Sequence, residues 1–168
     1  AKGPDGTRIL ATRQEPGLCP SCGEPLIPKL GPINARHWSH RGLTDCDPWS
    51  EHESPWHLAW KSLVAEAQQE VVIGPHRADL VTATGLVVEL QHSSLHPAEI
   101  AEREDFYGIG KMVWLWDLTE VEQNFCVRER DNYQTFRWLH PRKRIASCRS
   151  RTFMDLGYGV FELRKMYA

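Results

Sequence analysis

The chain has 168 residues, of which 41% are hydrophobic and 25% charged, and its formal net charge is −2. This composition is typical of a globular protein with one domain, or with a small module joined to a domain of about 120 residues. It excludes a uniformly basic, DNA-coating protein. Because no apolar run approaches the length of a membrane span and no signal peptide opens the chain, we expect no membrane partner. Five cysteines, an odd count, argue against a disulfide framework and for a reducing, cytoplasmic setting.

Residues 1–48 predict a small zinc-binding β module. A short strand is expected at Arg8 to Thr12, and Cys19-Pro-Ser-Cys22-Gly23 is typical of a metal-binding turn. Fourteen residues separate Cys22 from His37, a spacing that fits a structural zinc site. The segment has too little apolar mass to fold alone, so zinc would supply the missing stability. The predicted ligands are Cys19, Cys22 and His40, with either Cys46 or His37 as the fourth.

Residues 49–168 are predicted to form a second domain, and a helix opens it. This helix begins either at Ser50, as a capping box with Glu53, or at Ser54, followed by Pro55. We expect it to continue through Ser62–Gln69, a stretch of good helix formers that includes Leu63, Val64 and Ala67 and extends the apolar positions from Leu58. His57 and Lys61 lie one turn apart on one face, and Glu53 joins them if the helix begins at Ser50. Taken in isolation, such a charged stripe is typical of a solvated helix face.

A β-hairpin follows, with strands at Ala78–Val81 and Leu86–Gln91 and a turn between them. Its geometry brings Asp79 and Glu89 close to each other at one end, and Glu89 and Gln91 share one face. Carboxylates beside apolar strand positions are costly unless they bind something positive. The alternative is a solvated hairpin with charged edges. Hard oxygen ligands of this kind favour Mg²⁺ or Mn²⁺.

The next segments predict a helix from Pro97 to about Gly108 and then a strand at Met112–Trp116, whose continuous apolar run is typical of burial on both faces. Arg103 and Tyr107 stand four residues apart on that helix and face the same way. A hairpin, a helix and a strand in this order predict an α/β fold with a mixed central sheet flanked by helices.

The C-terminal part of the chain contains a basic segment and a closing hairpin at Phe153–Leu163. Between residues 137 and 151 there are six basic residues and no acidic one, with Trp138 and His140 interleaved. Positive charges capture phosphates and aromatic rings can stack on bases, so we expect a nucleic-acid-binding surface, the alternative being a solvated loop. The basic residues are Arg137, Arg142, Lys143, Arg144, Arg149 and Arg151.

Taken in order, these motifs resemble the competence protein CoiA-like nuclease family of the PD-(D/E)xK superfamily, over most of residues 5–118. The resemblance implies a bacterial or phage protein in which a zinc-ribbon-like module precedes a core like that of restriction endonucleases. Glu-x-Gln in place of Glu-x-Lys is common in that family. The motifs that carry the resemblance are Cys19-Pro-Ser-Cys22, His37-Trp-Ser-His40, Glu53-Ser54-x-x-His57-x-x-x-Lys61, Arg77-x-Asp79, Glu89-Leu-Gln91-x-Ser93-Ser94 and Arg103-x-x-x-Tyr107.

The function that this resemblance implies is a metal-dependent endonuclease that hydrolyses phosphodiester bonds in DNA. Asp79, Glu89 and the Leu90 carbonyl would bind the catalytic Mg²⁺ or Mn²⁺, and Glu53 would hold a second metal ion or bridge through a water molecule. Gln91 would position the attacking water, while Lys61 or His57 would replace the missing catalytic lysine. The resemblance also implies phosphate contacts from Ser94, Arg103 and Tyr107.

Two other functions fit the sequence. One is a nucleic-acid-binding module that keeps the fold without cutting, although Glu53, Asp79 and Glu89 together speak against it. The other is a regulator that responds to zinc or redox state through Cys19 and Cys22. A homodimer would let two sites cut two strands, and no residue pattern identifies an interface.

Overall fold

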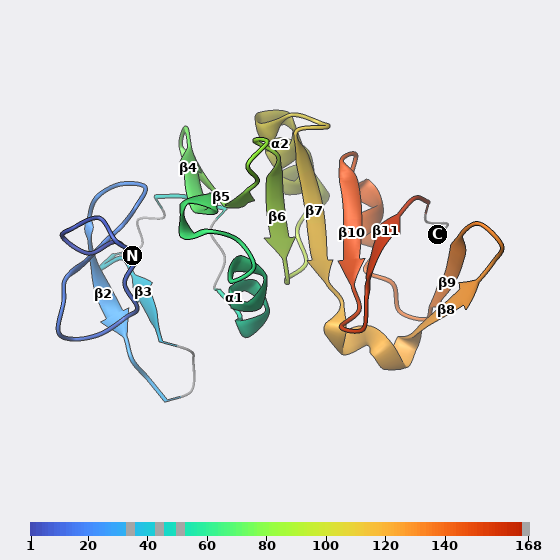
Figure 1. The fold of residues 1–168 in the computed structure, drawn as a ribbon, viewed down its shortest axis with the longest axis horizontal. Coiled ribbons are helices and arrows are strands. Elements are labelled where there is room, and N and C mark those ends of the chain that lie inside the picture. Colours follow the sequence, from blue (N-terminus) through green and yellow to red (C-terminus); the bar gives the residue numbers. More distant parts are fainter. Residues whose placement is uncertain (33–35, 43–45, 50–52, 166–168) are drawn as a thin grey trace. The chain divides into compact units, whose positions relative to one another are not determined.

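A computed structural model describes residues 1–32, 36–42, 46–49 and 53–165, without the side chains at 122 and 123. The chain divides into two compact units, residues 1–78 and residues 79–168, which are called unit 1 and unit 2 below (Figure 1). Strand β5 (His76–Val81) runs through the division. The predicted zinc module lies inside unit 1, and the domain boundary at residue 48 stays a prediction.

Unit 1 begins with a three-stranded antiparallel sheet of β1 (Gly17–Leu18), β2 (Pro25–Lys29) and β3 (His37–Ser39). A side chain at Gly17 would bring a Cβ within 2.9 Å of the Trp38 ring, so this close packing requires glycine. The predicted strand at Arg8 to Thr12 is wrong, because only Arg8 forms a bridge, an isolated one with Lys2. The backbone of Ile9 bonds instead to the Ala1 carbonyl and the Trp38 indole.

Helix α1 (Pro55–Lys61) begins at the second of the two predicted starts. Ser54 caps it, and His57 completes a capping box. Ser50, the other predicted start, lies outside the described residues. The predicted continuation through Ser62–Gln69 is wrong, because a 3₁₀ turn (Glu66–Gln68) and strand β4 (Gln69–Ile73) follow.

The early end of α1 has a tertiary cause. β4 is the hydrogen-bonded neighbour of β5, and Glu70 on β4 forms ion pairs with Lys61 and Arg77. Strand pairing and these ion pairs outweigh the helix propensity of the segment. Leu58 and Leu63, two apolar positions of the predicted helix, are exposed.

The sheet of unit 2 is mixed, and its strands follow the order β11-β10-β7-β6-β5. The predicted hairpin is confirmed by the antiparallel pair of β5 and β6. Helix α2 then connects β6 to the parallel strand β7, and β10 also runs parallel to β7. The bounds are Val87–Gln91 for β6, Pro97–Tyr107 for α2, Met112–Asp117 for β7, Arg151–Asp155 for β10 and Val160–Leu163 for β11. The predicted mixed α/β architecture is therefore confirmed.

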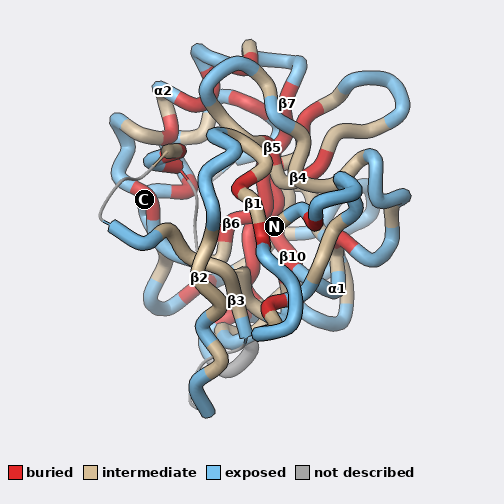
Figure 2. Tube along the Cα trace, turned by 90° about the vertical axis from the view of Figure 1, so that its left-hand side faces the viewer, coloured by how far each residue is buried: buried red, intermediate tan, exposed pale blue. Residues whose placement is uncertain are grey.

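The core of unit 2 lies along the central strands, where buried residues gather in Figure 2. Every residue of β7 is buried, as its apolar run predicts, and Trp114 and Trp116 are completely enclosed. The predicted closing hairpin is confirmed by β10 and β11. None of the described helices is both long enough and apolar enough to cross a membrane.

A second, two-stranded sheet in unit 2 was not predicted. β8 (Phe125–Glu129) and β9 (Gln134–Trp138) pair with each other and follow a 3₁₀ turn at Thr119–Asn124. Another 3₁₀ turn, Lys143–Ser147, leads from this hairpin to β10.

A single buried carboxylate, that of Glu104, joins three elements of unit 2. It accepts a hydrogen bond from the Trp114 indole at 3.0 Å, and thus connects α2 to β7. It also accepts from the backbone N–H groups of Arg149 and Ser150 at 2.8 and 2.7 Å, and from the Arg149 guanidinium at 2.9 Å. These bonds satisfy a charge that would otherwise be costly to bury.

We expect Glu104→Gln to destabilise the protein by about 2 kcal/mol, because the amide can keep the three bonds to Oε1 only by turning its NH₂ group toward the Arg149 guanidinium, and because the charge that pairs with this arginine is lost. Denaturant unfolding followed by circular dichroism measures this change. Glu102→Gln, at an exposed position of the same helix, is the matched control and should change the free energy of unfolding by less than about 0.5 kcal/mol. Equal stability of the two variants would contradict the role given to Glu104.

Candidate functional site

Four side chains of unit 1 form a cluster with the composition of a zinc site. Cys19, Cys22, His40 and Cys46 place their ligand atoms within 4.8 Å of one another. The Cys19 and Cys46 sulfurs are 3.4 Å apart, and the Cys22 sulfur is 3.3 Å from His40 Nε2. Three thiols and one imidazole at this separation match the ligand set of a tetrahedral structural zinc site. Of the two predicted fourth ligands, the cluster contains Cys46 and not His37.

The turn that carries Cys19 and Cys22 favours the thiolate form of Cys19, which is the form that binds a cation. The Gly23 N–H bonds to the Cys19 carbonyl, and Gly23 adopts a positive φ of 72°, which favours glycine. Burial alone would raise the pKa of the Cys19 thiol, but the N–H groups of Cys22 and Ser21 outweigh it and lower that pKa to about 6. Burial and the Cys19 thiol raise the pKa of Cys46 to about 12. A bound cation would relieve the electrostatic repulsion between the Cys19 and Cys46 sulfurs and stabilise both as thiolates.

Two polar side chains attach the zinc module to the rest of unit 1. Arg8 donates to Glu53 at 3.0 Å and to Gln69 at 2.6 Å. Asp47, which directly follows a predicted zinc ligand, is buried and accepts from the Arg77 N–H at 2.8 Å and from His76 at 3.0 Å. The zinc module is therefore joined to β4 and β5 by specific contacts within unit 1.

The predicted pair of carboxylates, Asp79 and Glu89, is brought together at the β5–β6 hairpin. Asp79 accepts a hydrogen bond from the Leu90 N–H at 3.0 Å. Glu89 is buried; one of its oxygens pairs with Arg103 at 2.9 Å, and the other, Oε1, is enclosed with no hydrogen-bond partner among the described residues. Burial and the nearby Asp79 charge raise the pKa of Glu89 to about 8, although Arg103 opposes them. A cation at this point would compensate both charges.

The neighbours of Glu89 complete this part of the site. Gln91 is buried, and its amide donates to the Ser93 carbonyl at 2.9 Å. Arg103, also buried, bridges Glu89 and Glu99, the latter at 2.6 Å. Tyr107 is buried and Ser94 is exposed. Arg103 therefore forms an ion pair with Glu89 in this structure, and its predicted phosphate contact stays a prediction.

The predicted residues of α1 belong to a network of ion pairs inside unit 1. Lys61 is buried and pairs with Glu53 at 3.0 Å and with Glu70, which also pairs with Arg77 at 2.6 Å. Burial opposes ionisation of Glu70, but Lys61 and Arg77 outweigh it and lower the pKa of this carboxyl. His57 is buried, and its Nδ1 lies 2.8 Å from the Ser54 hydroxyl.

Glu70 and Arg77 were not predicted as members of this network. Glu70 has a positive φ of 53°, an unfavourable conformation for a residue with a side chain, and its two ion pairs help to hold it there. No residue spacing in the sequence predicts these ion pairs of Glu70, because they depend on β4 lying beside β5.

Most of the predicted phosphate-binding cations bond within unit 2. Arg142 donates to the carbonyls of His92 and Asp117, and Arg144 donates to that of Leu95. Arg149 pairs with Glu104 and Asp105, and Arg151 with Glu162. Arg137 and Lys143 are exposed. Nucleic-acid binding by these residues stays a prediction.

Residues 5–48 match the family model described as "Competence protein CoiA, N-terminal domain". The N-terminal segment is therefore similar to the N-terminal domain of this family. The match covers about a quarter of the chain and includes all four residues of the metal-binding cluster. No curated protein and no solved structure matches the chain. The predicted resemblance to CoiA is thus confirmed for the zinc module.

The CoiA-type module offers a direct test of the fourth zinc ligand. Zinc content measured by mass spectrometry should be one ion per chain in the wild type and should fall several-fold in Cys46→Ser, because a hydroxyl is a much weaker ligand than a thiolate. His37→Ala is the matched control and should keep its zinc. Zinc loss in His37→Ala with retention in Cys46→Ser would reverse the assignment.

The raised pKa of Glu89 predicts how stability depends on pH. The folded protein keeps a proton that the unfolded chain releases above its ordinary pKa of 4.5, so the contribution is complete below 4.5 and is lost as pH rises through about 8. With no divalent cation added, the Tm of the wild type should therefore fall between pH 5 and pH 8 by several degrees more than that of Glu89→Gln, since 1 kcal/mol corresponds to roughly 2–4 °C. Parallel Tm profiles would show that Glu89 titrates normally.

Proposed function

We propose that the protein is a metal-dependent nuclease of the PD-(D/E)xK type that hydrolyses phosphodiester bonds in DNA. The observation that carries this proposal is the buried Glu89 carboxylate, with one oxygen lacking a hydrogen-bond partner among the described residues, beside Asp79 on the paired strand. Such an arrangement is unfavourable for a purely structural pair and favourable for binding a divalent cation.

The residues present fit a hard divalent ion. Asp79, Glu89 and the Leu90 carbonyl of unit 2 would supply oxygen ligands, and the second-ion role of Glu53, in unit 1, stays what the family resemblance implies. Bound Mg²⁺ or Mn²⁺ would polarise the phosphate and lower the pKa of a water molecule so that hydroxide forms near neutral pH. The fold agrees with this assignment, because an antiparallel hairpin, a helix and a parallel strand succeed one another around the carboxylates.

The other side chains divide the remaining tasks. Gln91 would orient the attacking water, since an amide has the hydrogen-bonding groups for this and lacks the basicity to remove a proton. For Lys61 of unit 1, whose ammonium group pairs with Glu53 and Glu70, stabilisation of negative charge on the phosphate stays a role that the family resemblance implies. As the alternative to Lys61, His57 would act as the proton acceptor. The exposed cations of unit 2 would hold the DNA backbone.

One observation favours a second candidate, a nucleic-acid-binding module without cleavage. The carboxylates of Glu89 and Glu53 already have cationic partners, Arg103 and Lys61, within the protein itself. Internal neutralisation of this kind can persist in a fold that has lost its metal. The description of the matched family as a competence protein agrees with either candidate, and we place the DNA-handling role in competence.

Cleavage of labelled single-stranded, duplex and four-way-junction DNA in Mg²⁺ or Mn²⁺ separates the two candidates. Glu89→Gln and Asp79→Asn should each lower the cleavage rate by at least about 100-fold, because each removes a charged metal ligand. Glu102→Gln removes an exposed carboxylate from α2 and should retain the wild-type rate. DNA binding without metal-dependent cleavage by the wild type would favour the inactive module.

A further inference from the structure

The β8–β9 hairpin of unit 2 has two chemically different faces. Cys126 is opposite Arg137 and Arg128 is opposite Thr135, so these four side chains share one face. The other face carries Phe125, Val127, Phe136 and Trp138. Phe125 stacks on Phe136 with ring centroids 5.0 Å apart and meets Trp138 edge-on at 5.5 Å. The aromatic face therefore stabilises the hairpin, whereas the side chains of the opposite face are available to contact a ligand.

Two exposed guanidinium groups distinguish this opposite face. Arg128 and Arg137 have no ion-pair partner within 4.0 Å in the part of the chain that the structure describes. In contrast, the guanidinium groups that follow along the chain are already bonded within unit 2, as at Arg142 and Arg149. Removing two isolated cations from water is favourable mainly when an anion replaces the water.

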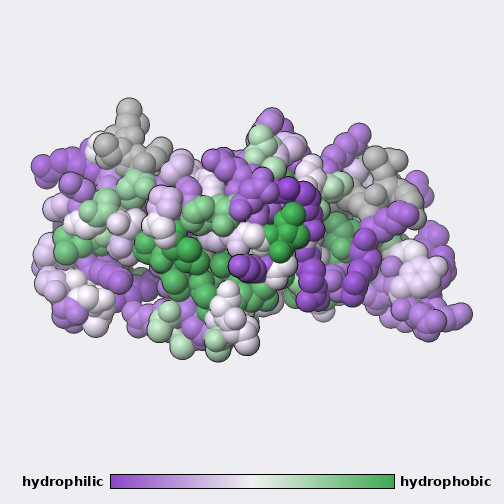
Figure 3. Space-filling view, turned by 90° about the horizontal axis from the view of Figure 1, so that it is seen from above, coloured by the Kyte–Doolittle hydropathy of each residue, from purple (hydrophilic) through white to green (hydrophobic). Residues whose placement is uncertain are grey.

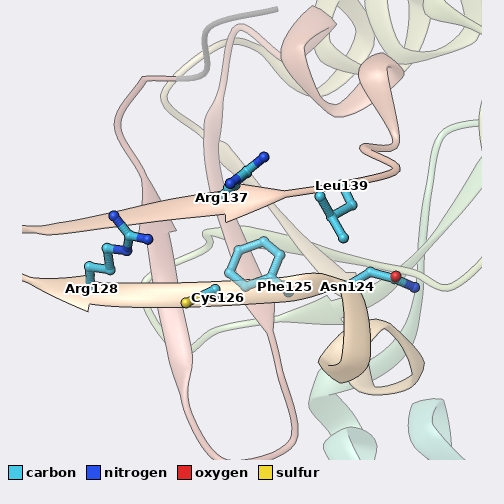
Figure 4. A pocket seen from close by; sticks show the side chains of 6 residues that line it. All are labelled: Asn124, Phe125, Cys126, Arg128, Arg137 and Leu139. Carbon is cyan, nitrogen blue, oxygen red and sulfur yellow. The ribbon is translucent and has the colours of Figure 1, made fainter.

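A shallow hollow lies between these two arginines. It encloses about 260 Å³, and Arg128, Arg137, Asn124, Phe125, Cys126 and Leu139 line it (Figure 4). Its surface thus combines cations, an amide and apolar carbon. The surface at this end of unit 2 is largely hydrophilic (Figure 3).

We propose that this face of the β8–β9 hairpin binds the sugar–phosphate backbone of a nucleic-acid strand. Arg128 and Arg137 are diagonal neighbours, which lie roughly 7–8 Å apart on a paired sheet, and so can contact separate phosphates of one strand. Guanidinium groups bind phosphate oxygens in a bidentate manner. Leu139, which is exposed at the edge of the hollow, offers apolar contact to a sugar or a base. The choice of a nucleic acid over an acidic protein rests on the proposed nuclease function.

This proposal assigns the strand contact to two specific residues rather than to the basic run as a whole. Arg128 lies outside that run, and Arg137 is its first member. The internally bonded arginines Arg142, Arg144, Arg149 and Arg151 would then stabilise unit 2 and contribute little to affinity.

The test is binding of a fluorescent oligothymidine, of a matched duplex and of polyglutamate, measured over a range of salt concentrations. All proteins carry Glu89→Gln and no divalent cation is added, so that binding is independent of cleavage. Arg128→Gln/Arg137→Gln should weaken oligothymidine binding roughly tenfold and reduce the slope of log K against log salt by about 1.4, as expected for two lost phosphate contacts.

The matched control is Lys111→Gln/Arg164→Gln, which removes two exposed positive charges elsewhere in unit 2. It should leave the salt slope unchanged. An equal loss of affinity in both double variants, or no loss in the hairpin variant, would overturn the proposal. Polyglutamate binding as tight as oligothymidine binding, lost in the hairpin variant, would instead identify an acidic protein as the partner.

Cys126 supplies a second measurement that does not depend on substitution. Its thiol is exposed and lies directly opposite Arg137. Saturating oligothymidine should slow the maleimide labelling of Cys126 at least several-fold, with Cys126→Ser identifying the labelled site, and an unchanged rate would overturn the proposal. These outcomes are separable from the nuclease activity. Protection of Cys126 without metal-dependent cleavage would support nucleic-acid binding by the hairpin and reject the nuclease function. Cleavage without protection would support the nuclease function and reject binding at the hairpin.

Discussion

The buried ion pair between Glu89 and Arg103 joins the strand that carries the candidate site to the helix that follows it. Glu89 would otherwise be a carboxylate enclosed beside a second carboxylate, that of Asp79, and Arg103 lowers the cost of this arrangement without removing it. The pair compensates only one oxygen of Glu89. The pair therefore offsets part of the cost of burying the carboxylates, while one oxygen of Glu89 remains suited to a further positive partner.

The parts of the fold that could be predicted are those in which local pattern and tertiary structure agree. The β5–β6 hairpin, α2 and β7 each show their own period, turn residues or apolar run, and β7 is buried throughout as its sequence indicates. The zinc ligands follow in the same way from the Cys-x-x-Cys turn. Three-dimensional structure was needed to separate Cys46 from His37, because both lie at acceptable spacings and only the cluster geometry decides between them.

The errors have identifiable physical causes. Ser62–Gln69 contains good helix formers, but Lys61 and Arg77 draw Glu70 into a strand beside β5, and a tertiary contact of this kind leaves no local trace. The β8–β9 hairpin did leave a trace. Phe125 and Val127 alternate with polar residues, as do Phe136 and Trp138, and Asp131-Asn132 lies between the two stretches. The arginine-rich segment begins at Arg137, inside the second of these stretches, so its composition indicates a charged surface where the alternation indicates a strand.

The distribution of charge also limits how this protein can contact a polyanion. With a net charge of −2, long-range attraction from the chain as a whole is weak, and most arginines of the C-terminal basic segment are used to connect loops to strands. In the proposed function, affinity for nucleic acid would then arise from a few cations that have no ion-pair partner among the described residues. Such an arrangement would bind a phosphate backbone weakly until the strand also reached a second site, so that the proposed binding at the hairpin and at the carboxylates would reinforce each other through effective concentration. With the proposed function, a protein built in this way would engage DNA where both contacts can be made and would not coat DNA indiscriminately.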